Sequence, residues 1–151
     1  MQLTRYTDYS IRVLMHLSTY PERRSCIAEI ARAYAISQSH LMKVVQDLGQ
    51  SGYVETARGR KGGIRLRKSA TEINLGALVR HTEKQFALVD CASCVIAPAC
   101  QVTDVFAQAT RAFLSVLDQY TLADMMTRRH QLHRLFAGSA ADATAGAGAR
   151  L

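Results

Sequence analysis

The sequence predicts a mainly α-helical fold with one small β-hairpin and one long helix in its second half. Three observations support this prediction. Apolar residues recur at helical spacing through the first 50 residues, the spacing changes to two between residues 53 and 67, and helical spacing returns over residues 101–120. The chain has 151 residues, of which 48% are apolar, so it can bury one ordinary core.

Three helices are expected before the hairpin. Residues 6–18 and 26–34 carry apolar stripes at helical spacing, and the shorter helix has Cys26 at its cap and Glu29 placed for a capping box. After a tight turn, Ser37 is expected to cap the third helix. The stripes of the first and third helices consist of Tyr6, Val13, Leu14 and Leu17, and of Leu41, Val44, Val45 and Leu48.

The hairpin and the later elements follow in order. The segments "YVETA" and "IRLR" are typical of short strands, and "RGRKGG" between them is typical of a turn. A short helix capped at Asn74 comes next, and beyond a cysteine-containing loop the stripe over residues 101–120 predicts a helix of about 30 Å. Thr121 is expected to begin a last helix. From residue 137 the chain is rich in Ala and Gly without periodicity, and we expect it to be disordered.

The order helix, turn, helix and hairpin is a winged helix-turn-helix pattern, which is typical of DNA-binding domains. The charge distribution favours the same function, because residues 1–70 carry 12 Lys and Arg against 5 Asp and Glu, whereas residues 71–151 carry 7 of each. The alternative is a protein-binding winged helix with a solvated basic hairpin. We expect a DNA-binding domain over residues 1–80, a loop over 81–100, a dimerisation helix and a C-terminal helix over 101–136, and a tail over 137–151.

Ten residues are candidates for contacts with double-stranded DNA. Five lie where the second helix of the motif begins, and their short or hydrogen-bonding side chains suit base edges and phosphates: Ser37, Gln38, Ser39, His40 and Lys43. The other five form the hairpin tip, where glycine lets the backbone approach DNA and arginine suits a narrow minor groove: Arg58, Arg60, Lys61, Gly62 and Gly63.

The composition indicates the cytoplasm. No run of about 18 apolar residues is present, and the first residues lack the apolar segment of a signal peptide. In a reducing compartment, clustered cysteines bind metal or take part in redox chemistry more often than they form structural disulfides.

Three of the four cysteines, Cys91, Cys94 and Cys100, lie in "CASCVIAPAC", while Cys26 stands alone. A structural zinc site needs four closed ligands, and no histidine follows Cys100 until His130. A Cys-x-x-Cys redox pair would leave Cys100 unused. Three thiolates can also hold an iron–sulfur cluster that takes its remaining ligand from elsewhere.

Four segments together resemble the NsrR family of nitric-oxide-sensing bacterial repressors, which belongs with the IscR family to the iron–sulfur winged-helix regulators. They are "LTRYTDYSIRVL", "IAEIARAYAISQSHLMKVVQDLGQSGYVET", "RGRKGGIRL" and "CVIAPAC". The resemblance extends over residues 1–127. It implies a homodimer formed through the long helix, with an iron–sulfur cluster, [4Fe–4S] in this family, held by the three loop cysteines.

The resemblance also implies that Asp8 of the first helix, supplied by the partner subunit, is the fourth ligand. In IscR-like proteins a histidine three residues after the last cysteine is the ligand and the cluster is [2Fe–2S]. This chain has Thr103 at that position, which favours the NsrR type. The short spacing between Cys91 and Cys94 departs from the NsrR pattern. Asp8 also stands one helical turn before Arg12, on a face shared with His16, so an ordinary ion pair is the alternative role for Asp8.

The expected function is therefore a transcriptional repressor. It would bind a palindromic operator and release it when nitric oxide reaches the cluster, so that genes for nitric-oxide detoxification are expressed. The alternatives are an IscR-like regulator of cluster assembly and a cysteine-based redox protein. No nicotinamide, flavin or nucleotide motif is present, and we expect no enzymatic activity.

Overall fold

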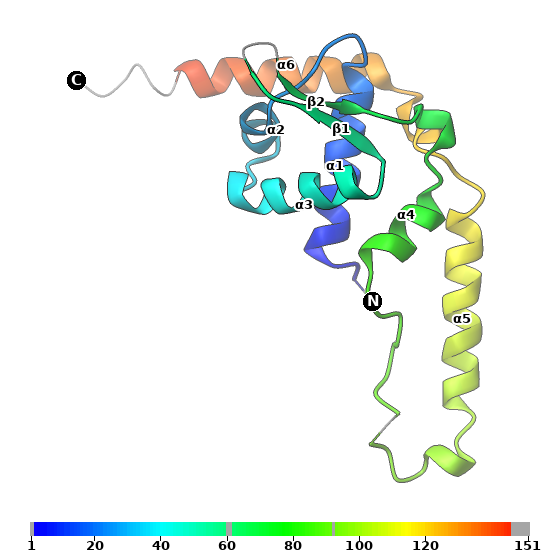
Figure 1. The fold of residues 1–151 in the computed structure, drawn as a ribbon. Coiled ribbons are helices and arrows are strands. Elements are labelled where there is room, and N and C mark those ends of the chain that lie inside the picture. The colour runs from blue at the N-terminus through cyan, green and yellow to red at the C-terminus, as the bar shows by residue number, and fades with distance from the viewer. Residues whose placement is uncertain (1, 60–61, 92, 146–151) are drawn as a thin grey trace.

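The computed structural model describes residues 2–59, 62–91 and 93–145, and it confirms the predicted fold class (Figure 1). Along these residues, six α-helices accompany one antiparallel two-stranded hairpin. The helices are α1 (Arg5–Thr19), α2 (Ile27–Tyr34), α3 (Gln38–Gln50), α4 (Leu75–Thr82), α5 (Val102–Leu117) and α6 (Arg129–Ala145). The strands are β1 (Val54–Ala57) and β2 (Gly63–Leu66), and short 3-10 turns lie at η1 (Ala70–Glu72), η2 (Ala97–Ala99) and η3 (Ala123–Met126).

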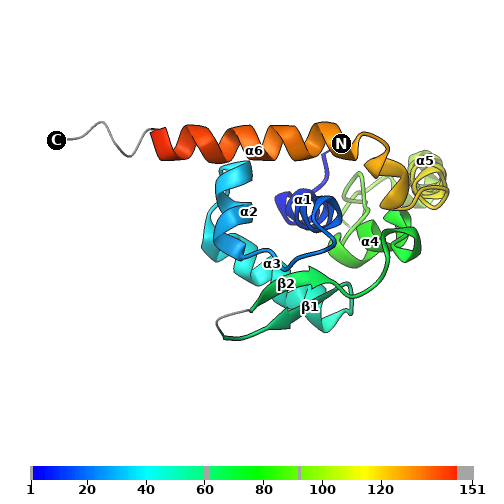
Figure 2. The ribbon, with the colours of Figure 1, turned by 90° about the horizontal axis from the view of Figure 1, so that it is seen from above.

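Residues 2–59 and 62–82 make up most of a head whose apolar core also includes Leu122. Figure 2 shows α1 at its centre, with α2, α3, the hairpin, α4 and α6 around it. The predicted apolar stripes of the first and third helices face this core, because residues three and four apart share one side of a helix. Leu14, Leu41 and Leu48 are fully buried, and burial of such a side chain contributes about 1.5–3 kcal/mol. Tyr6 is only partly buried at the core's edge.

The hairpin packs on the head through its inner face. Val54 pairs with Leu66 and Ala57 with Gly63. Ser25, which precedes α2, adds a further bridge: its backbone N–H donates to Ile64 O at 2.9 Å and its carbonyl accepts from Ile64 N at 2.8 Å. The chain before α2 therefore pairs with β2 at this one position, beside the two strands of the sheet.

Helix α5 stands beside the head rather than inside it (Figure 1). None of its residues is buried. Its C-terminal end is attached, because Leu75 N donates to Tyr120 O at 3.0 Å, Arg80 pairs with Asp118, and Leu122 inserts fully into the core. Its N-terminal end and the loop before it extend away from the head.

The C-terminal elements differ from the prediction. Thr121 begins no α-helix; its backbone N–H and hydroxyl both donate to Asp124 at 2.7 Å, and the 3-10 turn η3 starts two residues later. Helix α6 then runs from Arg129 to Ala145, so the boundary expected at residue 136 does not coincide with a helix end. Residues 146–151 of the predicted disordered tail lie outside the described residues. No helix in the described part of the chain is long and apolar enough to cross a membrane.

Candidate nucleic-acid interface and cysteine loop

The start of α3 presents the predicted polar surface. Ser37, Gln38, Ser39, His40 and Lys43 are all exposed, whereas the opposite side of the helix is buried in the core. Ser37 occupies the N-cap position but makes no side-chain capping bond, because its hydroxyl pairs with that of Ser39 at 2.7 Å. The helix therefore presents backbone N–H groups together with short polar side chains, which suits contact with phosphate.

A compact turn sets the position of α3 relative to α2. Ala35 adopts the left-handed conformation (φ 52°, ψ 42°), and Ile36 N donates to Ala31 O at 2.9 Å. This bond closes the C-terminal end of α2, and only three residues connect α2 to α3. The helix-turn-helix predicted from the sequence is thus present in the fold.

Ion pairs stabilise the base of the hairpin, and its turn needs a glycine. The Glu55 carboxylate accepts from Arg65 and Arg24, and these hydrogen bonds, that from Arg65 foremost, lower the pKa of Glu55. At Gly62 an added Cβ would lie 2.4 Å from Ala57 O, so the turn accepts no side chain there. Arg58 is exposed beside the turn. Gly63 begins β2 at φ 137°, and the predicted contacts Arg60 and Lys61 lie outside the described residues.

The cysteine loop is a series of turns with a step of three residues. Cys94 N donates to Cys91 O at 3.3 Å, Ala97 N to Cys94 O at 3.1 Å, and Cys100 N to Ala97 O at 3.3 Å. All three thiols are free; Cys94 is exposed, and Cys91 and Cys100 are half-buried. Among the described residues, no three His, Cys, Asp or Glu side chains lie close enough together to hold a metal ion.

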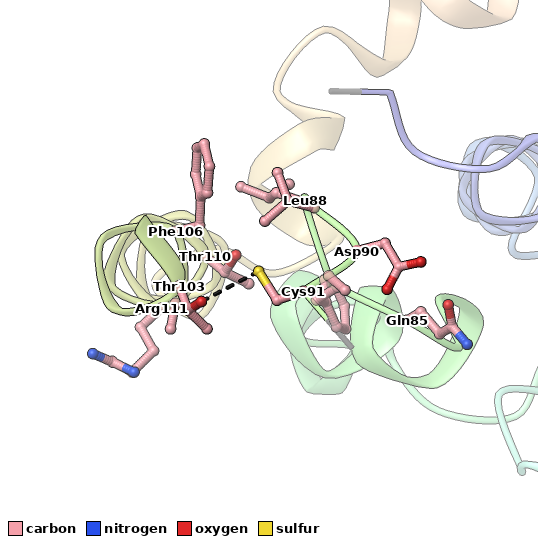
Figure 3. A pocket seen from close by; sticks show the side chains of 12 residues that line it. Gln85, Leu88, Asp90, Cys91, Thr103, Phe106, Thr110 and Arg111 are labelled. Carbon is pink, nitrogen blue, oxygen red and sulfur yellow. Dashed lines mark hydrogen bonds between the residues drawn. The ribbon is translucent and has the colours of Figure 1, made fainter. Parts of the chain in front are cut away.

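Cys91 lies against α5 in an open pocket of about 840 Å³ between the loop and that helix (Figure 3). The hydroxyl of Thr103 donates to Cys91 Sγ at 3.2 Å. Phe106 of α5 and Leu88 of the loop are apolar residues that line the same pocket. The position at which IscR-like proteins were expected to carry histidine is therefore occupied by a hydrogen-bond donor to one of the thiols.

Asp8 lies in the first turn of α1. Arg12 Nε donates to both carboxylate oxygens of Asp8, at 2.8 and 2.9 Å, and both side chains are about half exposed. The ion pair considered as the alternative role is thus present, and the carboxylate remains accessible from outside.

His16 follows Arg12 on the same side of α1 but is 1% exposed; its Nε2 lies 3.4 Å from Glu29 Oε1, and burial lowers its pKa. The expectation for Glu29 was wrong. Glu29 forms no capping box with exposed Cys26; it accepts hydrogen bonds from the guanidinium of Arg23 instead.

The sequence did not predict the contact between the start of the cysteine loop and α1. Glu83, at the end of α4 where the cysteine loop begins, is buried against the first turn of α1. Its Oε1 accepts from the backbone N–H and hydroxyl of Thr4 at 2.7 and 2.9 Å and from the hydroxyl of Thr7 at 2.5 Å. The loop is therefore anchored to the helix that carries Asp8. No local sequence signal could have shown this contact, since its partners are more than 70 positions apart.

Comparison with known proteins places this fold. Residues 3–128 match the Rrf2 family, described as an iron-dependent transcriptional regulator. The chain belongs to this family. It is 48% identical over 141 residues to the transcriptional regulator NsrR of Bacillus licheniformis, an alignment covering 89% of this chain and 99% of the relative. The identity to NsrR of Bacillus subtilis is also 48%, over 89% of this chain and 97% of the relative.

Solved structures confirm the architecture. IscR of T. potens superposes with a TM-score of 0.69 at 22% identity, over 85% of this chain and 88% of that chain. CymR of B. subtilis gives a TM-score of 0.69 at 22% identity, over 85% and 98%. The predicted resemblance to the NsrR family is confirmed, and the chain is a transcriptional regulator rather than an enzyme.

Proposed function

We propose that the chain is a cytoplasmic, homodimeric repressor of the NsrR type, whose affinity for a palindromic operator is controlled by an iron–sulfur cluster and by nitric oxide. The observation that carries the proposal is the combination of 48% identity to NsrR with three free thiols on one loop. The regulated genes would be those of nitric-oxide detoxification.

The head supplies DNA binding. The exposed start of α3 enters the major groove, and the hairpin reaches the flanking minor groove with Arg58 and the adjoining basic residues. Phosphate contacts of this kind give affinity, whereas the polar side chains of α3 contact base edges.

The cysteine loop has a donor set that fits a cluster. Thiolate is the ligand that iron–sulfur clusters use, and Cys91, Cys94 and Cys100 are free and not fully buried. The half-exposed carboxylate of Asp8 is available to a partner subunit once Arg12 releases it. When bound, the cluster supplies iron that reacts with nitric oxide; [4Fe–4S] is the proposed type.

The contacts of α1 provide a route from the loop to the DNA-binding surface. Glu83 ties the loop to Thr4 and Thr7 in the first turn of α1. One residue after Asp8, the ring of Tyr9 lies 6.4 Å from that of His40 on α3. A change in what Asp8 binds therefore alters the helix that supports the recognition surface, and the two states differ in DNA affinity.

The proposal is tested with protein purified without oxygen. We expect a visible chromophore with iron and sulfide in equal amounts, lost on replacing Cys91, Cys94 or Cys100 with serine and kept in Cys26→Ser. A content of two irons per cluster would favour the IscR-like alternative. Colourless, iron-free protein from anaerobic cells would contradict the proposal.

Asp8 and Arg12 form a matched pair of variants. If Asp8 is the inter-subunit ligand, Asp8→Ala should keep iron and dimer but weaken operator binding and blunt the response to nitric oxide, whereas Arg12→Ala should respond normally. If Asp8 serves only the ion pair, both variants should behave alike and lose about 0.3–0.5 kcal/mol of stability.

A further inference from the structure

A backbone hydrogen bond joins Cys91 and Cys94. Cys94 N donates to Cys91 O at 3.3 Å, an i to i+3 bond of the kind that closes a β-turn. A β-turn keeps its end Cα atoms within about 7 Å, and a disulfide bond spans Cα separations of about 4.4–6.8 Å. The backbone therefore already holds these two cysteines within reach of a disulfide.

The other two cysteines are not placed in this way. Two further turns separate Cys94 from Cys100. Cys26 lies at the start of α2 in the head, away from the loop (Figure 1). Of the four cysteines, all of which the structure describes, one pair is joined by such a bond.

The two thiols of the pair have different surroundings. Cys94 is exposed to solvent, whereas Cys91 is half-buried and receives the hydrogen bond from Thr103 on α5 (Figure 3). Redox-sensitive sites commonly combine an accessible thiol with a neighbouring resolving thiol. Cys94 fits the first role and Cys91 the second, with Thr103 as a positioning residue that holds Cys91 Sγ.

We propose that hydrogen peroxide converts this pair to a reversible disulfide in the cluster-free chain. Cys94 Sγ attacks one peroxide oxygen, the O–O bond breaks, and Cys94 becomes a sulfenic acid as water leaves. Cys91 Sγ then attacks the Cys94 sulfur, the S–S bond forms, and the hydroxyl leaves as water with the Cys91 proton. Two thiols lose two electrons, and one peroxide becomes two waters.

This disulfide would control loading of the cluster, a consequence that rests on the proposed function. Two of the three proposed ligands are consumed when the pair closes. The oxidised chain then accepts iron only after a dithiol reductant reopens the loop. Cluster-loaded chain is protected, because its thiols are already engaged.

The full-length, cluster-free chain is the material for the test. After titration with hydrogen peroxide, free thiols should fall from four to two, the intact mass should drop by two hydrogens, and a dithiol reductant should restore both. Cys100→Ser and the control Cys26→Ser should still close the disulfide, whereas Cys91→Ser and Cys94→Ser should not. Thr103→Val should reach the same end point more slowly.

Three results would overturn the inference: retention of four thiols, a disulfide that requires Cys26 or Cys100, or a bond between chains. Iron uptake then separates this inference from the proposed function. A pair that closes, in a chain whose reduced form never takes up iron, would leave the thiol switch standing and refute the cluster. If the chain with the disulfide formed still takes up iron normally, the disulfide does not control loading of the cluster.

Discussion

At the scale of single residues, Glu83 is the side chain that ties the cysteine loop to the head. Its buried carboxylate accepts three hydrogen bonds from Thr4 and Thr7. Glu83→Gln leaves at least one of these donors poorly paired, and we expect a loss of about 1–3 kcal/mol in the free energy of unfolding. Urea denaturation at neutral pH measures it. Glu22→Gln, an exposed control, should change stability by less than about 0.5 kcal/mol.

The same carboxylate predicts a pH dependence. Burial raises the pKa of Glu83, but the hydrogen bonds from Thr7 and Thr4 outweigh it, and the pKa is lowered from its ordinary value of 4.5. A carboxyl with a lowered pKa in the folded state stabilises above the unfolded pKa and loses that contribution as the pH falls through the folded value. The stability gap between wild type and Glu83→Gln should therefore shrink below about pH 4.5. A gap that stays constant would show that the charge is not involved.

Pairs of residues were predictable where helix geometry alone brings them together. Asp8 and Arg12 are one turn apart, and their ion pair is present as the sequence indicates. The partner of Glu29 was predicted wrongly, because Arg23 reaches it from the turn before α2, whose path no local rule fixes. The contacts of Glu83 depend on the packing of α4 against α1, which becomes known only with the fold.

At the scale of elements, α6 is attached to the head by an aromatic cluster. Phe136 packs against His16, Tyr34 and Tyr20 at ring-centroid distances of 5.0, 5.4 and 6.4 Å. We expect Phe136→Ala to cost about 1–3 kcal/mol, below the value for a fully buried Phe because the ring is half-buried. Leu135→Ala, an exposed neighbour, is the control. Equal unfolding midpoints for the two variants would show that the cluster does not hold α6.

Helices with an apolar stripe were found from the sequence, whereas the second half of α6 was not. The stripes of α1, α3 and α5 repeat at helical spacing, and these helices form within a few residues of the predicted bounds. Beyond residue 136 the sequence consists mainly of Ala and Gly. Alanine favours helix strongly but has no side chain that shows amphipathic periodicity. Periodicity alone therefore predicts a disordered tail where such a helix forms.

The hairpin predicts a salt-dependent contribution to DNA binding. Arg58 is exposed beside the turn, whereas Arg24 and Arg65 are engaged by Glu55. Arg58→Ala should weaken operator binding and reduce the slope of log affinity against log salt by about one. Arg134→Ala removes the same charge from α6, which lies across the head from the hairpin (Figure 2), and should leave the slope unchanged. Equal slopes in both variants would remove the hairpin tip from the interface.

At the scale of the whole molecule, the chain combines a head that contains the apolar core with the helix α5, which has no buried residue. Periodicity predicted α5 but not which side of it faces its own chain. Phe106, Phe113 and Leu117 are half-buried, and Phe106 lines the pocket that α5 forms with the loop, so part of the predicted stripe is intramolecular. The three thiols show a similar limit: their spacing indicates a ligand set, but its assembly in the proposed function depends on a second protomer.

Five other apolar residues of α5 lie exposed along one side and form what we call the α5 stripe: Val102, Val105, Ala109, Ala112 and Val116. Val105 and Val116 are 60% and 52% exposed, and three helical turns separate them, so the stripe runs most of the length of the helix. An apolar surface of this extent is typical of an interface. In the proposed homodimer it packs against the same stripe of a second copy, as closed two-fold symmetry requires.

A charge placed on the α5 stripe should therefore separate the protomers. Val116→Glu buries two uncompensated carboxylates across a two-fold seam, and we expect the dimer dissociation constant to rise at least about 100-fold. Ser115→Glu adds the same charge one residue away, off the stripe, and should remain dimeric in sedimentation equilibrium. Because a palindrome engages two heads, Val116→Glu should also lose operator affinity. A Val116→Glu protein that stays dimeric would place the interface elsewhere.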